Sequence, residues 1–150
     1  MKRAEIIIIV IALIGFVLNY FNIVGATTLL IVSLNTLAVF YFYLSYALFN
    51  GLSIRESLRK SSYVNISRAK LSTAILSGIV LATSIVSILF KTLNYPGSYM
   101  IYISLLLSIA LFVYLLYKHT KDSGIFYYTI LKRIGAVSII ILLMVGNITI

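Results

Sequence analysis

The sequence predicts an all-α protein, a polytopic transmembrane helical bundle with five spans. Three observations support this fold class. First, the chain of 150 residues is 62% hydrophobic and only 10% charged, whereas soluble domains are about 25% charged. Second, 112 residues lie in four stretches without a charged side chain, and about 20 apolar residues suffice to cross a bilayer. Those stretches are 6–54, 71–90, 92–117 and 134–150. Third, basic residues alternate between successive loops, a pattern that five spans explain.

The first charge-free stretch is long enough for two spans. We expect its break at residues 19–28, NYFNIVGATT, where two Asn and one Gly interrupt the apolar run. This break places the first two spans at about 5–22 and 27–49, and the turn-forming pair Asn50-Gly51 ends the second.

The N-terminus also has a second interpretation. Lys2 and Arg3, followed by an apolar run and the small residues Gly25 and Ala26, have the pattern of a secretory signal peptide. Cleavage near residue 26 would leave four spans. The internal repeat described below favours keeping this segment as a span.

A basic connector, residues 52–70, separates the two halves of the chain. Ser53 and Glu56 have the spacing of a capping box, which predicts a short interfacial helix. Three spans follow the connector, and a tight loop at 91–98 contains the only Pro. We expect these spans at about 71–90, 99–117 and 130–150. The last is at the short limit, because only 17 of its residues form a charge-free run.

The basic residues set the expected orientation. The first loop has no charge and the third has only Lys91, whereas the connector and the fourth loop are rich in Lys and Arg. The positive-inside rule therefore predicts a multi-pass protein of a bacterial inner (cytoplasmic) membrane, with the N-terminus inside and the C-terminus outside. These cations are expected to contact the lipid bilayer rather than nucleic acid. They are Arg55, Arg59, Lys60, Arg68, Lys70, Lys132 and Arg133.

Residues 6–46 and 78–118 have the character of a tandem repeat. A shift of 72 residues aligns Asn22 with Asn94 and Gly25 with Gly97, so both tight loops contain Asn-x-x-Gly at the same offset. The sequence thus predicts a single transmembrane domain, 1–150, made of a duplicated two-helix hairpin and a fifth helix.

The second hairpin carries a family resemblance over about residues 75–116. Its loop, ILFKTLNYPG, resembles the Leu-Phe-Lys-x-x-His-Trp-Pro-Gly loop of the two-helix membrane (stator) subunit of the gliding-motility/type IX secretion motor, and of related small bacterial membrane proteins. The matching residues are Phe90, Lys91, Tyr95, Pro96 and Gly97. The resemblance implies a proton-driven stator in which a membrane Lys and a Glu on the following helix act together. Lys91 matches that Lys, but residues 92–120 contain no Asp or Glu, so what remains implied is the scaffold.

Candidate packing residues lie in the second and third spans. Ala74, Gly78 and Ala82 recur every four residues, which predicts a face that another helix can approach closely. Asn35 is the most polar side chain expected at mid-membrane, and we expect it to form an interhelical hydrogen bond. In the second tight loop, Pro96-Gly97 is expected to fix the turn.

The numbers of Cys, His and acidic residues argue against catalysis and metal binding. The chain has no Cys, one His and three acidic residues, so we expect no catalytic set, no metal site, no cofactor and no enzyme activity. The leading hypothesis is a structural or accessory subunit of a membrane complex, with a membrane-protein partner or as a homo-oligomer. The alternatives are a small transporter or ion-conducting protein and an oligomerising, membrane-perturbing effector.

Overall fold

The computed structural model of the protein describes residues 1–64, 66–122 and 124–146, and it consists of helices joined by short turns. Its five long helices are α1 (Lys2–Tyr20), α2 (Ala26–Phe49), α4 (Arg68–Thr92), α5 (Met100–Lys121) and α6 (Ile125–Gly146). Two short elements, α3 (Ile54–Ser57) and η1 (Lys60–Tyr63), lie in the connector. All five long helices have the length and composition to cross a membrane. The all-α, five-span fold class is therefore confirmed.

The helix ends differ from the expected spans where polar residues continue a helix. α5 extends to Lys121 rather than ending near 117, because Lys118, His119 and Lys121 in its last turn suit the negative end of the helix dipole. α6 begins at Ile125 instead of 130, since the aromatic residues before Lys132 join the helix. Residues 147–150 of the expected fifth span lie outside the described residues.

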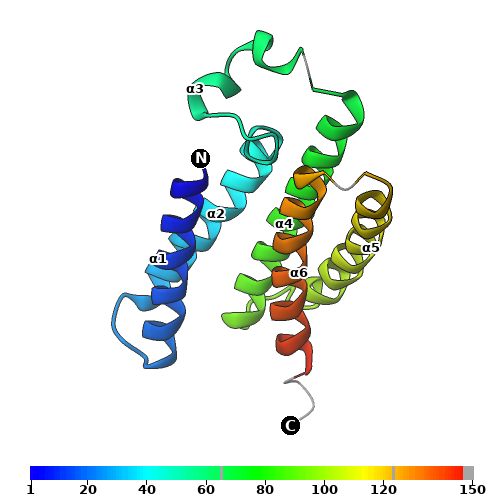
Figure 1. Cartoon of the computed structure of the whole chain (residues 1–150). Helices are drawn as coiled ribbons and strands as arrows, with labels where there is room; N and C mark the ends of the chain where they lie inside the picture. Colours follow the sequence, from blue (N-terminus) through cyan, green and yellow to red (C-terminus); the bar gives the residue numbers. More distant parts are fainter. Residues whose placement is uncertain (65, 123, 147–150) are drawn as a thin grey trace.

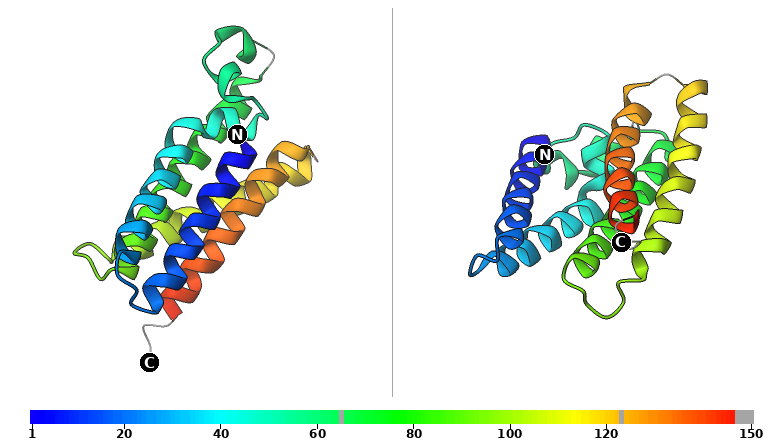
Figure 2. Two further views of the ribbon diagram at one scale, coloured as in Figure 1. Left: turned by 90° about the vertical axis from the view of Figure 1, so that its left-hand side faces the viewer. Right: turned by 90° about the horizontal axis from the view of Figure 1, so that it is seen from below.

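Helix α4 is the centre of the bundle. It packs against α2, α5 and α6, whereas α1 has its main contact with α2 (Figures 1 and 2). In its most apolar window 67% of the α4 residues are buried, against 17% for both α1 and α6. Figure 1 places the N-terminus, the connector and the turn between α5 and α6 at one end, which we call the basic end. The end of α6 lies at the other.

Helices α2 and α4 cross closely at Gly78. A Cβ at this position would overlap the Ser45 side chain and would lie 2.6 Å from the Tyr41 carbonyl oxygen. Ala74, one turn earlier, is fully buried, and Ala82, one turn later, is 6% exposed. The small-residue face therefore packs against α2 of the same chain, through the close approach that small side chains permit.

The two tight loops have the same backbone conformation. Asn22 and Asn94 have φ values of +54° and +51°, and Gly25 and Gly97 have +85° and +95°. In both loops the residue after Asn donates its N–H to the carbonyl five residues earlier, from Ile23 to Leu18 and from Tyr95 to Phe90. Asn and Gly are the residues that tolerate positive φ best, which explains why the loops share this spacing.

The ends of the helices repeat with the same 72-residue offset that relates the two tight loops. α1 and α4 end at Tyr20 and Thr92, 72 residues apart, and α2 and α5 end at Phe49 and Lys121, again 72 apart. The two hairpins occupy different surroundings, however, because α4 is central and α1 is peripheral. Their origin by duplication stays a prediction.

The connector contains the predicted capping box. Ser53 Oγ accepts the Glu56 N–H at 3.3 Å, and the Glu56 carboxylate accepts the Ser53 N–H at 2.8 Å. These hydrogen bonds lower the pKa of Glu56 below its usual value. Nearby, the Tyr63 hydroxyl donates to the Ser57 carbonyl at 2.7 Å, and burial raises the pKa of Tyr63 to about 12. The connector is thus a folded cap on the basic end.

Replacing Gly78 tests the α2–α4 crossing. Gly78→Ala should destabilise the protein by about 1–3 kcal/mol, because α2 and α4 must move apart to admit one methyl group. In detergent the thermal unfolding midpoint should fall by roughly 3–10 °C. Ser72→Ala, an exposed position on α4, is the control and should leave the midpoint unchanged. An unchanged midpoint for Gly78→Ala would contradict a close crossing.

Candidate functional site

Three helices contribute to a buried polar cluster near the basic end, which we call the Glu5 cluster. Arg133 from α6 binds both carboxylate oxygens of Glu5 from α1, with Nε to Oε1 at 2.5 Å and Nη2 to Oε2 at 2.6 Å. The Tyr41 hydroxyl from α2 donates to Glu5 Oε1 at 2.5 Å. Arg133 Nη1 also donates to the Thr129 carbonyl at 3.0 Å. The bidentate geometry is the strongest form of an Arg–carboxylate pair.

The Glu5 cluster is shielded from its surroundings. Glu5 is 3% exposed and Tyr41 is 4% exposed, while the Arg133 guanidinium lies 5.6 Å from the centre of the Phe49 ring. Arg133 is eight residues into α6, roughly 12 Å along the helix. A charge at this depth is costly unless it is paired. The cluster therefore joins the first and last of the five long helices through an ion pair of zero net charge, and both Glu5 carboxylate oxygens are hydrogen-bonded.

Sequence reasoning missed the Glu5 cluster. We assigned no role to Glu5 and assigned Arg133 to orientation and lipid contact, but the two side chains form an ion pair inside the bundle. The two residues are 128 positions apart, so no local pattern connects them. The available signal was the position of Glu5 itself, an acid inside a helix and directly before the apolar run of residues 6–18.

The other basic residues assigned to orientation and lipid contact lie at the basic end, and their contact with lipid stays a prediction. Lys132 sits 4.4 Å from the centre of the Tyr128 ring, and Lys70 lies 6.0 Å from the centre of the Phe126 ring. Arg55 and Arg59 are exposed in the connector, and Arg68 is exposed at the start of α4. Lys60 opens η1, and its side chain lies outside the described residues.

The loop motif folds around Phe90 at the opposite end of the bundle. The Phe90 and Tyr95 rings meet edge to face with centres 6.0 Å apart, and a Cβ on Gly97 would lie 3.5 Å from the Phe90 ring. Pro96 is exposed between them, and Lys91 is half-buried in the last turn of α4. Among the described residues the one ion pair is Arg133–Glu5, so Lys91 has no acidic partner there.

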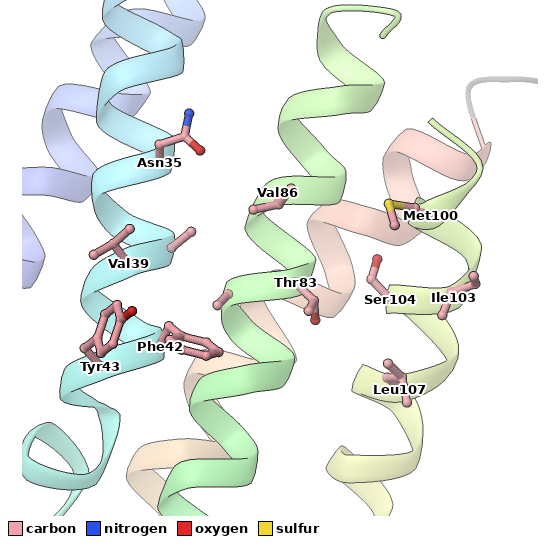
Figure 3. Close-up of a pocket in the computed structure, with 12 residues that line it drawn as sticks. Asn35, Val39, Phe42, Tyr43, Thr83, Val86, Met100, Ile103, Ser104 and Leu107 are labelled. Atoms are coloured by element: carbon pink, nitrogen blue, oxygen red, sulfur yellow. The ribbon is translucent and has the colours of Figure 1, made fainter. Parts of the chain in front are cut away.

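A second feature is a cavity of about 410 Å³ open to the side of the bundle, which we call the lateral groove. Figure 3 shows α2 and α5 as its walls, with α4 between them. Most of its lining is apolar, and the polar exceptions are the Asn35 amide and the hydroxyl groups of Tyr43, Thr83 and Ser104. The side chains that define it in Figure 3 are Asn35, Val39, Phe42, Tyr43, Thr83, Val86, Met100, Ile103, Ser104 and Leu107.

The position of Asn35 corrects an expectation. Its side chain was expected to bond across to another helix, but the amide nitrogen donates to the Ile31 carbonyl of its own helix at 2.9 Å. The side chain is exposed and lines the lateral groove instead of the α2–α4 interface, which the smaller residues occupy. Within the described residues this is the one hydrogen bond that the Asn35 side chain makes.

Buried hydroxyl groups hold α4 and α5 together. Ser87 and Ser104 share a hydrogen bond of 2.7 Å across the interface, and each also donates or can donate to a carbonyl of its own helix. Ser77 likewise bonds to the Thr73 carbonyl at 2.7 Å. These contacts fit the packing role of small hydroxyl residues in membrane helices.

Comparisons with protein-family models, with curated proteins and with solved structures find no match for this chain. The described part of the chain contains no group of three or more His, Asp or Glu side chains that could hold a metal ion. The class defined by the fold is an integral membrane protein with five candidate spans. Its function has to be inferred from the Glu5 cluster and the lateral groove.

Variants that break the Glu5 cluster should lower the free energy of unfolding of the bundle. Glu5→Leu and Arg133→Leu should each cost about 3–5 kcal/mol, because each leaves one buried charge unpaired. The double variant Glu5→Leu/Arg133→Leu should lose less than either single variant, since it leaves no charge behind. Thermal unfolding in detergent measures the three losses.

Lys132→Leu is the matched control for this series, because it removes an exposed cation next to Arg133. It should change the free energy of unfolding by less than about 1 kcal/mol. Strictly additive losses in the double variant would contradict a coupled, buried pair.

Proposed function

We propose that this protein is a non-enzymatic accessory subunit of a bacterial inner-membrane complex, and that its lateral groove receives a transmembrane helix of a partner protein. The N-terminus and the basic end face the cytoplasm in this proposal, in keeping with the positive-inside rule. The hairpin of α4 and α5, with its stator-like loop, serves as scaffold. The single observation that carries the proposal is the exposed Asn35 amide in the wall of an apolar groove.

The depth of Asn35 gives this observation its weight. The residue lies nine positions after the start of α2 and fourteen before its end, in the middle of a helix roughly 36 Å long. At that depth the surroundings are hydrocarbon, where an amide without a full set of hydrogen bonds is costly. A partner helix that donates a hydrogen bond to the side-chain amide oxygen of Asn35, Oδ1, removes that cost.

A helix suits the groove better than a lipid chain. Transmembrane helices associate through close packing and interhelical hydrogen bonds, and Asn is among the residues that form them. The floor of the groove is made of small residues, Ala38 and Ala82, which let a helix approach α2 and α4 closely. An acyl chain would fill the same volume but would leave the Asn35 amide unsatisfied.

A cross-linking experiment tests this occupant, and the chain helps because it has no Cys. Val39→Cys places one thiol in the groove, and Val32→Cys places one on α2 in a smaller cavity beside α1. After cross-linking in native membranes, Val39→Cys should give an adduct with a different membrane protein, and Val32→Cys should not. Adding Asn35→Leu should lower the yield of the adduct about tenfold, because one interhelical hydrogen bond is lost.

Thr36→Val is the matched control for Asn35→Leu. Thr36 is the next residue on α2, is exposed, and bonds to the Val32 carbonyl at 2.7 Å, but it does not line the groove. It should leave the adduct unchanged. A Val39→Cys adduct with a second copy of this chain, with lipid alone, or with a partner that Asn35→Leu does not affect would overturn the proposal.

The Glu5 cluster favours a second candidate, a small transporter or ion-conducting protein. Ionisable side chains held within membrane helices are a recurrent feature of proton and ion pathways. If Glu5 takes part in such a pathway, proteoliposomes should conduct protons or ions, and Glu5→Gln should abolish the flux. Glu56→Gln, which changes an exposed acid of the connector, should leave it intact. The absence of flux above that of empty liposomes would exclude this candidate.

A further inference from the structure

A second cavity lies at the basic end, where four helices converge. It has a volume of about 320 Å³ and is lined by residues from the start of α1, the end of α2, the first turn of α4 and the first two turns of α6. Unlike the lateral groove, this basic-end cavity has polar and apolar walls in comparable measure. It is separate from the groove, with which it shares no lining residue.

The charge of the basic-end cavity is positive. Lys2 from α1 and Lys70 from α4 both line it, although they are far apart in the sequence. No acidic residue is among its lining residues, and the nearest carboxylate on α1, that of Glu5, is already bound by Arg133 and Tyr41. Within the described residues neither lysine forms an ion pair. Two cations facing one cavity without a counter-charge favour an anionic ligand.

The helix ends add to this preference. Ile125 and Phe126, the first two residues of α6, line the cavity, so the positive end of the α6 dipole is directed toward it. Such a terminus favours phosphate and carboxylate groups, and here it acts together with two lysines in a formed cavity. Asn50, whose amide nitrogen donates one hydrogen to the Tyr46 carbonyl at 2.6 Å, keeps a second hydrogen for a ligand.

The apolar walls indicate what else the ligand carries. Leu48, Phe49 and Phe126 face the cavity beside the lysines. A phosphate group with an attached hydrocarbon portion would meet cations at one side and apolar side chains at the other. Basic pockets between helices at the cytoplasmic side of membranes are suited to anionic lipid head groups.

We propose that the basic-end cavity is a binding site for one phosphate-bearing anion, held between Lys2 and Lys70. The phosphate belongs either to an anionic phospholipid or to a soluble phosphate compound, which share this chemistry. The site is independent of the lateral groove and of the partner proposed for it. Occupancy ties α1 to α4 and α6, with which the α1 backbone makes no close contact among the described residues.

Binding can be measured on the purified full-length protein in a neutral detergent. The probes are phosphatidylglycerol, the zwitterionic phosphatidylcholine, and inorganic phosphate, and the readouts are native mass spectrometry and the thermal midpoint. We expect one tightly retained phosphatidylglycerol and a raised midpoint, with no such retention of phosphatidylcholine. Inorganic phosphate that competes with the lipid or raises the midpoint by itself would assign the site to soluble phosphates, and its inactivity would assign it to the lipid.

Double variants distinguish binding at the basic-end cavity from a general attraction of anions to the basic protein. Lys2→Gln/Lys70→Gln should weaken binding about 30-fold, and Lys2→Arg/Lys70→Arg should retain it. Arg55→Gln/Arg59→Gln removes the same charge from exposed connector positions outside the cavity and should leave binding unchanged. Equal losses in the two Gln pairs, equal retention of phosphatidylcholine, or no retention of any probe would overturn the proposal. Retained binding by the Arg pair shows that the fold has survived.

Discussion

Helices α2 and α4 approach so closely at Gly78 that one added methyl group would overlap Ser45. Both the Glu5 cluster and the lateral groove are built next to this contact. Tyr41, whose carbonyl lies at the crossing, sends its hydroxyl to Glu5 and so ties α1 to the central pair. One turn further along α4, Ala82 forms the floor of the lateral groove with Ala38 of α2. A wider crossing would change both the cluster and the groove.

The Glu5 cluster performs a different task from close packing. Helix α1 has its main backbone contact with α2, yet its carboxylate reaches Arg133 on α6, so the pair joins the first span to the last. Buried ion pairs contribute little net stability compared with well-packed apolar residues, but an unpaired member is strongly destabilising. The cluster therefore specifies how α1 and α6 are placed, because alternative placements would leave a charge in hydrocarbon.

The lateral groove and the basic-end cavity divide the surface by chemistry. The groove lies at mid-depth, is largely apolar and contains one incompletely satisfied amide, which suits a helix. The cavity lies at the end of the bundle and combines lysines with aromatic walls, which suits an amphiphilic anion. The two proposals therefore concern separate surfaces, and each can be tested without the other.

The sequence by itself determined the number of spans, the loops between them and the location of charge. Apolar stretches must become helices in a bilayer, Asn22, Gly25, Asn94 and Gly97 supply the positive φ that tight loops need, and Ser53 with Glu56 encodes a local cap. These are properties of short segments, so pattern reasoning reaches them. It also identified the small-residue face of α4, although not the helix that covers it.

Only the tertiary structure decided which side chains meet. It paired Glu5 with Arg133 across 128 positions, turned Asn35 toward the groove, and brought Lys2 and Lys70 to one cavity. In a chain this apolar, hydrophobicity distinguishes bilayer from water but not one helix face from another, so it cannot rank helix pairings. Those pairings depend on shape at Gly78 and on a few polar groups, whose partners are set by packing in three dimensions.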